Sequence, residues 1–184
     1  MVLGMVEFET IAAGIRASDA MAKAALVTFL TSRPITPGRY MSLVTGDVAS
    51  VEASVKAGVA DAGEEAVVQS FILADLHEQI APALRGEAPA PERGAVGVLE
   101  TSCAAAIVEA ADAACKASPV MLLRLHLALH VGGKGFAVFV GDVADVEAAV
   151  AAGVRAAGGA LVDRSVLPNP YPEVYGQLCG EYPW

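Results

Sequence analysis

The 184-residue chain contains no long uncharged stretch, although 55% of its residues are hydrophobic. Its longest segments without Asp, Glu, Lys or Arg, such as residues 24–32, are roughly nine residues long, about half of what a membrane-spanning helix needs. The N-terminal residues do not show a basic region followed by an apolar one, the pattern of a secretory signal peptide. The sequence therefore predicts no membrane association. The excess of apolar residues predicts burial between subunits instead.

Basic residues, aromatic residues and paired cysteines are also scarce. Twelve Lys and Arg residues stand against 21 Asp and Glu residues, giving a net charge of −9, and only 5% of the residues are aromatic. Nucleic-acid binding needs clustered positive charge and stacking surfaces, so it is not expected. Cys103, Cys115 and Cys179 form no CxxC pair, so neither a disulfide framework nor a zinc site is indicated. We expect a cytoplasmic protein without a metal or cofactor.

An internal repeat is the strongest feature of the sequence. The segments "GDVASVEASVKAGVADAG" (residues 46–63) and "GDVADVEAAVAAGVRAAG" (141–158) are identical at 13 of 18 positions. Upstream the spacing is 93 residues instead of 95, which predicts a two-residue insertion between the first helix and the turn of the second half. Because the intervening residues are rich in Pro, Gly and charge, we predict domains at 1–86 and 95–184, the second with a C-terminal tail, and a linker at 87–94.

Each half reads as strand, helix, strand, strand, helix, strand, followed by a short helix. Valines recur every three or four residues after Asp47 and after Asp142, which predicts helices with these aspartates at the N-cap and glycines at the end. In the first half we predict strands at 5–8, 26–33, 40–45 and 67–73, and helices at 11–25, 48–62 and 76–84. This order is the ferredoxin-like α+β arrangement.

Groups that could perform catalysis are not recognisable. Leucines alternate with other residues from Leu123 to His130, which predicts a strand and separates His126 and His130 too far for one metal ion. "GGKG" lacks the helix that a phosphate loop needs. The recurring pair Glu7 and Glu100 is more typical of a structural than an acid–base role. The sequence therefore predicts a protein that is not an enzyme.

Four pairs of segments resemble the tandem-domain shell proteins of bacterial microcompartments, in their unpermuted subclass. They are "GMVEFET" with "AVGVLETS", "DAMAKAA" with "DAACKAS", "PGRY" with "GGKG", and the repeated "GDVxxVEAxVxAG". The resemblance implies a pseudohexameric homotrimer that tiles with hexameric and pentameric shell proteins into the microcompartment shell. It also implies a central pore for small polar metabolites.

The resemblance assigns roles to individual residues. The implied pore lining is Thr36, Pro37, Gly38, Val131, Gly132 and Gly133, with Arg39 and Lys134 at the pore mouth. Arg39 and Lys134 are equally compatible with solvated strand ends. The implied edge contacts between tiles involve Lys23, Lys116, His77, Asn169 and Tyr171.

Two departures from the family pattern qualify these assignments. Some relatives carry a Cys-Pro-Gly turn that binds an iron–sulfur cluster, whereas this chain has Thr36, whose hydroxyl does not suit iron. Asn169 and Tyr171 replace the usual Arg and His of an edge motif, and His77 alone represents that motif in the first half. Two alternatives stay open: an electron-conducting trimer with an iron–sulfur cluster, and a ligand-sensing regulatory module on a ferredoxin-like scaffold.

Overall fold

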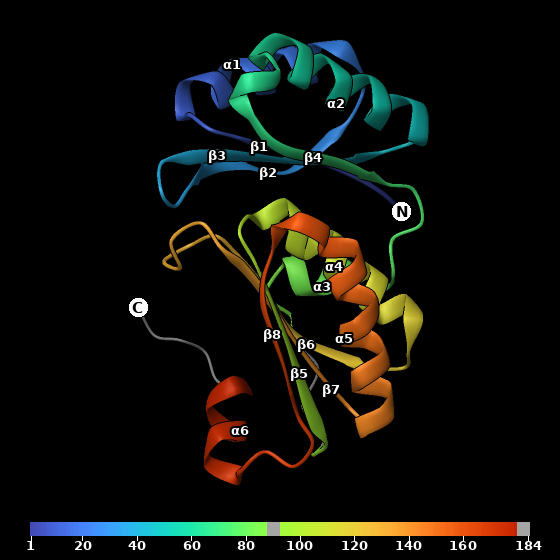
Figure 1. The fold of residues 1–184 in the computed structure, drawn as a ribbon. Helices are drawn as coiled ribbons and strands as arrows, with labels where there is room; N and C mark the ends of the chain where they lie inside the picture. Colours follow the sequence, from blue (N-terminus) through green and yellow to red (C-terminus); the bar gives the residue numbers. More distant parts are fainter. Residues whose placement is uncertain (88–92, 180–184) are drawn as a thin grey trace. The chain divides into compact units, whose positions relative to one another are not determined.

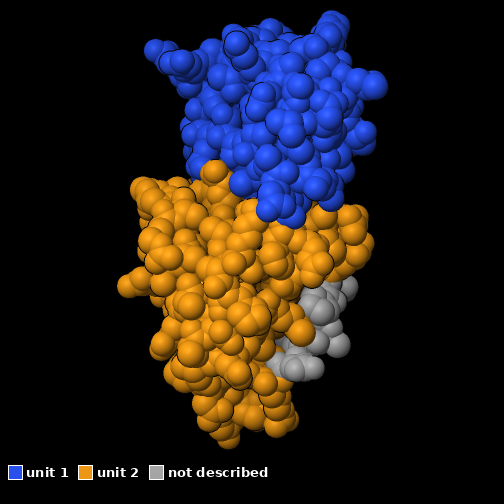
Figure 2. Space-filling view, turned by 90° about the vertical axis from the view of Figure 1, so that its right-hand side faces the viewer, with its two compact units in different colours: residues 1–76, 103–105, 127–134 blue, residues 77–102, 106–126, 135–184 orange. Residues whose placement is uncertain are grey.

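The structure, a computed structural model, describes residues 1–87 and 93–179. Most of the predicted linker, residues 88–92, therefore lies outside the described residues. The chain divides into two compact units (Figure 2). Unit 1 comprises residues 1–76, 103–105 and 127–134, and unit 2 comprises residues 77–102, 106–126 and 135–184.

Two four-stranded sheets repeat one topology, as Figure 1 shows. The first half contains β1 (Val2–Phe8), α1 (Ile11–Ala24), β2 (Thr28–Ile35), β3 (Arg39–Gly46), α2 (Val48–Ala62), η1 (Glu64–Ala66) and β4 (Val67–Leu73). The remainder contains α3 (Ile80–Leu84), β5 (Ala95–Thr101), α4 (Ala104–Ala117), β6 (Met121–Leu127), β7 (Gly135–Gly141), α5 (Val143–Ala157), η2 (Gly158–Ala160), β8 (Leu161–Leu167) and α6 (Pro172–Cys179). The strand orders β2-β3-β1-β4 and β6-β7-β5-β8 confirm the predicted α+β fold with two βαββαβ domains.

Close packing between helix and sheet is the same in both halves. Figure 1 shows α1 and α2 on one face of the first sheet. A Cβ atom on Gly4 of β1 would lie 2.6 Å from Val51 and 2.8 Å from Val55 of α2. A Cβ atom on Gly97 of β5 would likewise lie 2.7 Å and 2.8 Å from two valines of α5. Any side chain at these glycines would push the helix away from the sheet, so they set the thickness of both cores.

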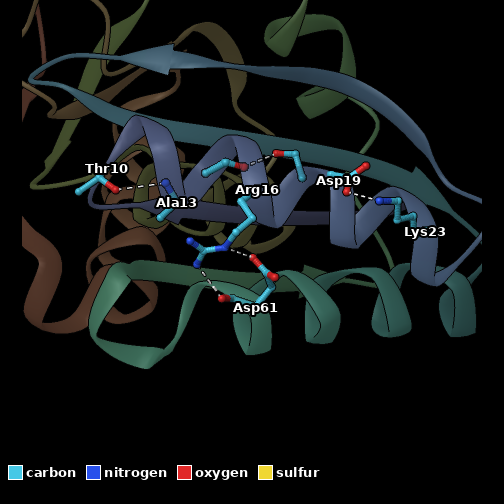
Figure 3. A network of polar contacts seen from close by, with 8 residues as sticks. Thr10, Ala13, Arg16, Asp19, Lys23 and Asp61 are labelled. Carbon is cyan, nitrogen blue, oxygen red and sulfur yellow. Dashed lines mark hydrogen bonds and ion pairs between the residues drawn. The ribbon is translucent and has the colours of Figure 1, made fainter.

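The helix ends follow the sequence signals. The Asp47 carboxylate accepts the Ser50 backbone N–H at 2.9 Å and the Ser50 hydroxyl at 2.7 Å, and these hydrogen bonds lower the pKa of Asp47. Gly63 ends α2 with a φ of 83°, a conformation that glycine adopts without strain. The Arg16 side chain of α1 binds Asp61 near the end of α2 at 2.8 Å (Figure 3). The N-cap and the end predicted for α2 are thus confirmed.

Two local predictions were wrong, and the position of the insertion can be narrowed. The strand predicted through His130 ends at Leu127, because Ala128 and His130 have φ values of 58° and 60°, outside the extended region. The two-residue insertion predicted between helix and turn lies there, just after β6: β2 and β6 still begin 93 residues apart, whereas three residues connect β2 to β3 and seven connect β6 to β7. The short helix predicted at 76–84 spans only Ile80–Leu84.

Helix α6 also packs against the second sheet. Tyr175 and Leu178 of α6 pack against a cluster of buried residues in unit 2, namely Val96, Leu123, Val138 and Val140. Helix α6 follows β8 as α3 follows β4, in agreement with the short helix predicted after each half. Among the described residues, no helix combines the length and apolar character needed to cross a membrane.

Candidate functional site

The first predicted pore segment is a tight turn. Thr36, Pro37 and Gly38 connect β2 to β3, and the Gly38 N–H donates to the Ile35 carbonyl at 3.0 Å. Gly38 has a φ of 106°, which favours glycine, and the peptide bond between Thr36 and Pro37 is cis. Pro37 and Gly38 are exposed, and Thr36 is half-buried. The turn offers one hydroxyl and accessible backbone groups, and no charge.

The second predicted pore segment is a longer, internally bonded loop. Ala128–Lys134 closes on itself through the Ala128 N–H, which donates to the Lys134 carbonyl at 3.0 Å, and the Lys134 N–H, which donates to the Val131 carbonyl at 3.3 Å. The residues in left-handed conformation are Ala128, His130, Gly132 and Gly133. Gly132 is exposed, whereas Gly133 is buried. The loop therefore has a defined shape even though it has no regular secondary structure.

These two segments contact one another within unit 1. The His130 backbone N–H donates to the Thr36 hydroxyl oxygen at 3.3 Å. Gly133 packs so closely that a Cβ atom there would lie 2.8 Å from Pro37 Cδ and 2.9 Å from the Thr36 carbonyl oxygen. Residues about 95 positions apart in the sequence thus form one continuous surface. His130 belongs to this surface, although sequence reasoning assigned it to a strand face; its neighbouring glycines were the signal for a loop.

Arg39, predicted at the pore mouth, is engaged by two carboxylates. Its guanidinium donates to Glu7 at 3.2 Å and to Glu9 at 3.4 Å. Glu7 is fully buried and also accepts the backbone N–H groups of Ala104 and Ala105 at 2.9 and 3.2 Å. Burial raises the pKa of Glu7, and these donors oppose that effect. The positive charge of Arg39 is therefore offset by its neighbours, whereas the Lys134 side chain is exposed.

The two predicted edge lysines occupy different environments. Lys23 forms an ion pair with Asp19 on α1, and both side chains are largely exposed (Figure 3). Lys116 forms the equivalent pair with Asp112 at 2.7 Å, but the Asp112 side chain is buried and also accepts the His77 backbone N–H at 2.8 Å. The repeated sequence signal therefore leads to one pair with both side chains exposed and one pair in which the carboxylate is buried and only the lysine reaches solvent.

The remaining predicted edge residues lie around two hollows of unit 2. Asn169 and Tyr171 are exposed and line a cavity of about 770 Å³, together with Arg93 and Tyr175. His77 is half-buried beside a second hollow of about 860 Å³, and its Nδ1 accepts the Gln79 N–H at 3.4 Å. The structure does not bring His77 together with Asn169 and Tyr171 in one hollow.

Cysteines and acidic residues do not gather into a recognisable metal site in the part of the chain that the structure describes. No group of three or more His, Cys, Asp or Glu residues there could hold an ion. The Cys103 thiol donates to Gln69 Oε1 at 3.1 Å, and burial, reinforced by Asp112, raises the pKa of Cys115 to about 12. Both described thiols are thus buried, which is typical of structural cysteines and not of reactive ones.

Comparisons with known proteins identify the fold and its role. The family model of the BMC domain matches residues 2–76 and 95–170. The bacterial microcompartment shell protein PduT of Citrobacter freundii is 41% identical over 96% of both chains. The carboxysome assembly protein CcmO of Synechococcus elongatus is 31% identical over 96% of this chain and 68% of its own. A crystal structure of a microcompartment protein from Desulfitobacterium hafniense matches with a TM-score of 0.83 at 42% identity, covering 95% of this chain and 98% of that one. This chain belongs to the family of tandem BMC-domain shell proteins, structural and non-enzymatic components of the bacterial microcompartment shell.

Proposed function

We propose that the chain forms a homotrimeric, pseudohexameric tile whose central pore passes small polar metabolites. Its rim would consist of Thr36, Pro37 and Gly38 alternating with Val131, Gly132 and Gly133 from the second half, residues 95–184. The observation that carries this proposal is the contact between the two segments, through His130 and Thr36 and through Gly133 and Pro37. A ring of two alternating segments requires each segment to have the other as its neighbour.

The chemistry of the rim suits a passage for polar molecules. Thr36 offers a hydroxyl group, and the exposed Gly38 and Gly132 leave backbone N–H and C=O groups accessible to a solute. Glycine permits this close approach because no side chain covers the backbone. Since none of the six rim residues carries a charge, passage would depend on size and hydrogen bonding.

Exposed apolar side chains support assembly into a closed ring. Ile11 and Ile15 lie four residues apart on α1 and are 37% and 55% exposed, and Leu26 and Leu30 are 93% and 47% exposed. Contiguous exposed apolar surface is typical of interaction sites, and cyclic trimers bury such surface without leaving free ends. At the tile edges, Lys23, Lys116, His77, Asn169 and Tyr171 are the residues that we propose for contacts with hexameric and pentameric shell proteins.

The oligomeric state tests the first part of this proposal. Light scattering after size-exclusion chromatography should give three times the chain mass of 18.7 kDa. Electron microscopy of the protein mixed with a hexameric shell protein should show flat sheets or closed shells. A stable monomer would contradict the proposal.

Crosslinking tests the position of the rim. In Thr36→Cys, thiols from three protomers would meet near the axis, so a short bis-maleimide should join protomers covalently. Ala60→Cys, at an exposed position of α2, is the matched control and should give no more product than the wild-type cysteines. Equal crosslinking of both variants in a confirmed trimer would place Thr36 away from the axis.

A further inference from the structure

The loop between β6 and β7 carries a side chain that the first half lacks. It has seven residues, Ala128–Lys134, where the equivalent turn of the first half has three. His130 lies in this additional length, with a φ of 60° and an exposed side chain. Its backbone N–H is bound by the Thr36 hydroxyl, so the loop holds His130 directly beside the first rim segment.

His130 is also the one titratable residue within residues 36–38 and 128–133. The charged residues that follow these two segments in the sequence are Arg39, which is offset by Glu7 and Glu9, and Lys134 at the end of the loop. Apart from Lys134, the charge on this surface therefore depends on the imidazole. Imidazole donates a hydrogen bond when neutral and carries a positive charge when protonated, which suits carboxylate and phosphate groups.

We propose that His130 sets the charge selectivity of the pore, with three imidazoles per trimer favouring small anionic solutes over cations. This inference rests on the proposed trimer and adds to it, because the six rim residues taken alone are neutral. The duplication makes this arrangement possible: a side chain present in one half occurs three times around the ring, between three copies of the Thr-Pro-Gly turn.

Conductance of the assembled trimer in a planar lipid bilayer tests the inference. Reversal potentials in a KCl gradient give the ratio of chloride to potassium permeability. His130→Asn removes the imidazole and keeps a residue that tolerates positive φ. At pH 5.5 the ratio should fall about two- to threefold in this variant, the effect of losing charges a few ångströms from an ion in water.

Two further variants separate charge from structure. His130→Lys, which places a permanent positive charge at this position, should restore the wild-type anion preference at pH 5.5. His126→Gln is the matched control, because His126 lies in β6 and stacks on Phe136 at 4.9 Å, outside the two rim segments. It should leave the ratio unchanged.

The outcomes distinguish this inference from the proposed function. A trimer that conducts with the same selectivity in wild type and His130→Asn at pH 5.5 would overturn the role of His130 and leave the pore intact. An equal effect of His126→Gln would overturn it as well. Absence of a trimer or of any conductance would overturn the proposed pore together with this inference.

Discussion

The contact between the two predicted rim segments can be tested by adding one methyl group. Gly132 and Gly133 are adjacent and both have positive φ, 66° and 86°. A Cβ atom on Gly132 would meet nothing within 4 Å, whereas one on Gly133 would lie 2.8 Å from Pro37 Cδ and 2.9 Å from the Thr36 carbonyl oxygen. The two alanine variants therefore share the conformational effect, and only Gly133→Ala tests the packing of the loop on the turn.

The expected magnitudes follow from these two effects. An L-residue in the left-handed region costs about 1–2 kcal/mol, and alanine recovers about 0.4–1 kcal/mol by restricting the unfolded chain, so Gly132→Ala should lose about 1 kcal/mol. Gly133→Ala should lose a further 1–3 kcal/mol, roughly, because the contacts at 2.8–2.9 Å demand displacement of the backbone of the turn. At about 2–4 °C per kcal/mol for a chain of this length, the melting temperatures of the two variants should differ by about 5 °C.

Thermal unfolding followed by circular dichroism measures this difference. Wild type and both variants are compared at one protomer concentration, because the stability of an oligomer depends on concentration. Melting temperatures of the two variants that agree within about 1 °C would refute the reasoning, since Gly133 would then have no closer neighbours in solution than Gly132.

Three further predictions concern buried polar groups. Burial raises the pKa of Glu7, so the stability that its protonated form contributes is present at low pH and is lost as the pH rises through the raised pKa. The free energy of unfolding in urea should therefore decrease less between about pH 4 and pH 7 in Glu7→Gln than in wild type. Cys115, with a pKa of about 12, should resist N-ethylmaleimide at pH 8 until the protein unfolds, as peptide mass spectrometry would show; rapid labelling in the native state would contradict its burial. Asp112→Ala should lose about 1–2 kcal/mol because it removes the buried carboxylate that accepts the His77 N–H and pairs with Lys116, whereas Asp19→Ala should lose at most about 0.5 kcal/mol in the same denaturant assay; equal losses would contradict the asymmetry.

Regular elements were predictable because their signals are local and duplicated. The valine spacing after Asp47 is repeated after Asp142, and both segments form helices of 15 residues. A pattern that occurs twice is unlikely to arise by chance in a non-helical segment, and the glycine at each end marks where the helix stops. The order of elements then left a ferredoxin-like sheet as the arrangement that buries both helix faces.

The loop at 128–134 was not predictable in the same way. Alternating leucines continue past the end of β6, so periodicity alone extended the strand to His130. The strand stops because Ala128 already adopts a positive φ, stabilised by the hydrogen bond of its N–H to Lys134 six residues later. Such a closing bond depends on the whole loop, and the repeat could not reveal it, because the corresponding turn of the first half is shorter.

The different environments of Lys23 and Lys116 could not be predicted from the sequence for a related reason. Asp19 and Lys23 have the same spacing as Asp112 and Lys116, and both pairs form as i, i+4 ion pairs on helices. The Asp112 carboxylate is buried and accepts the N–H of His77, from the segment that follows β4, whereas Asp19 is largely exposed. Tertiary surroundings therefore decide which member of a repeated pair is exposed.

Taken together, the differences between the halves are concentrated outside their cores. A Cβ atom on Gly4 or on Gly97 would meet equivalent valines at nearly equal distances, so the helix–sheet packing tolerates little change. The loop bearing His130 and the surroundings of Lys23 and Lys116 differ, and these are the parts proposed to face the pore and the tile edge. A single-domain hexamer would have to repeat any rim or edge residue six times. A tandem chain is free to place a residue three times, so an imidazole between neutral turns is an arrangement that only the duplicated chain can provide.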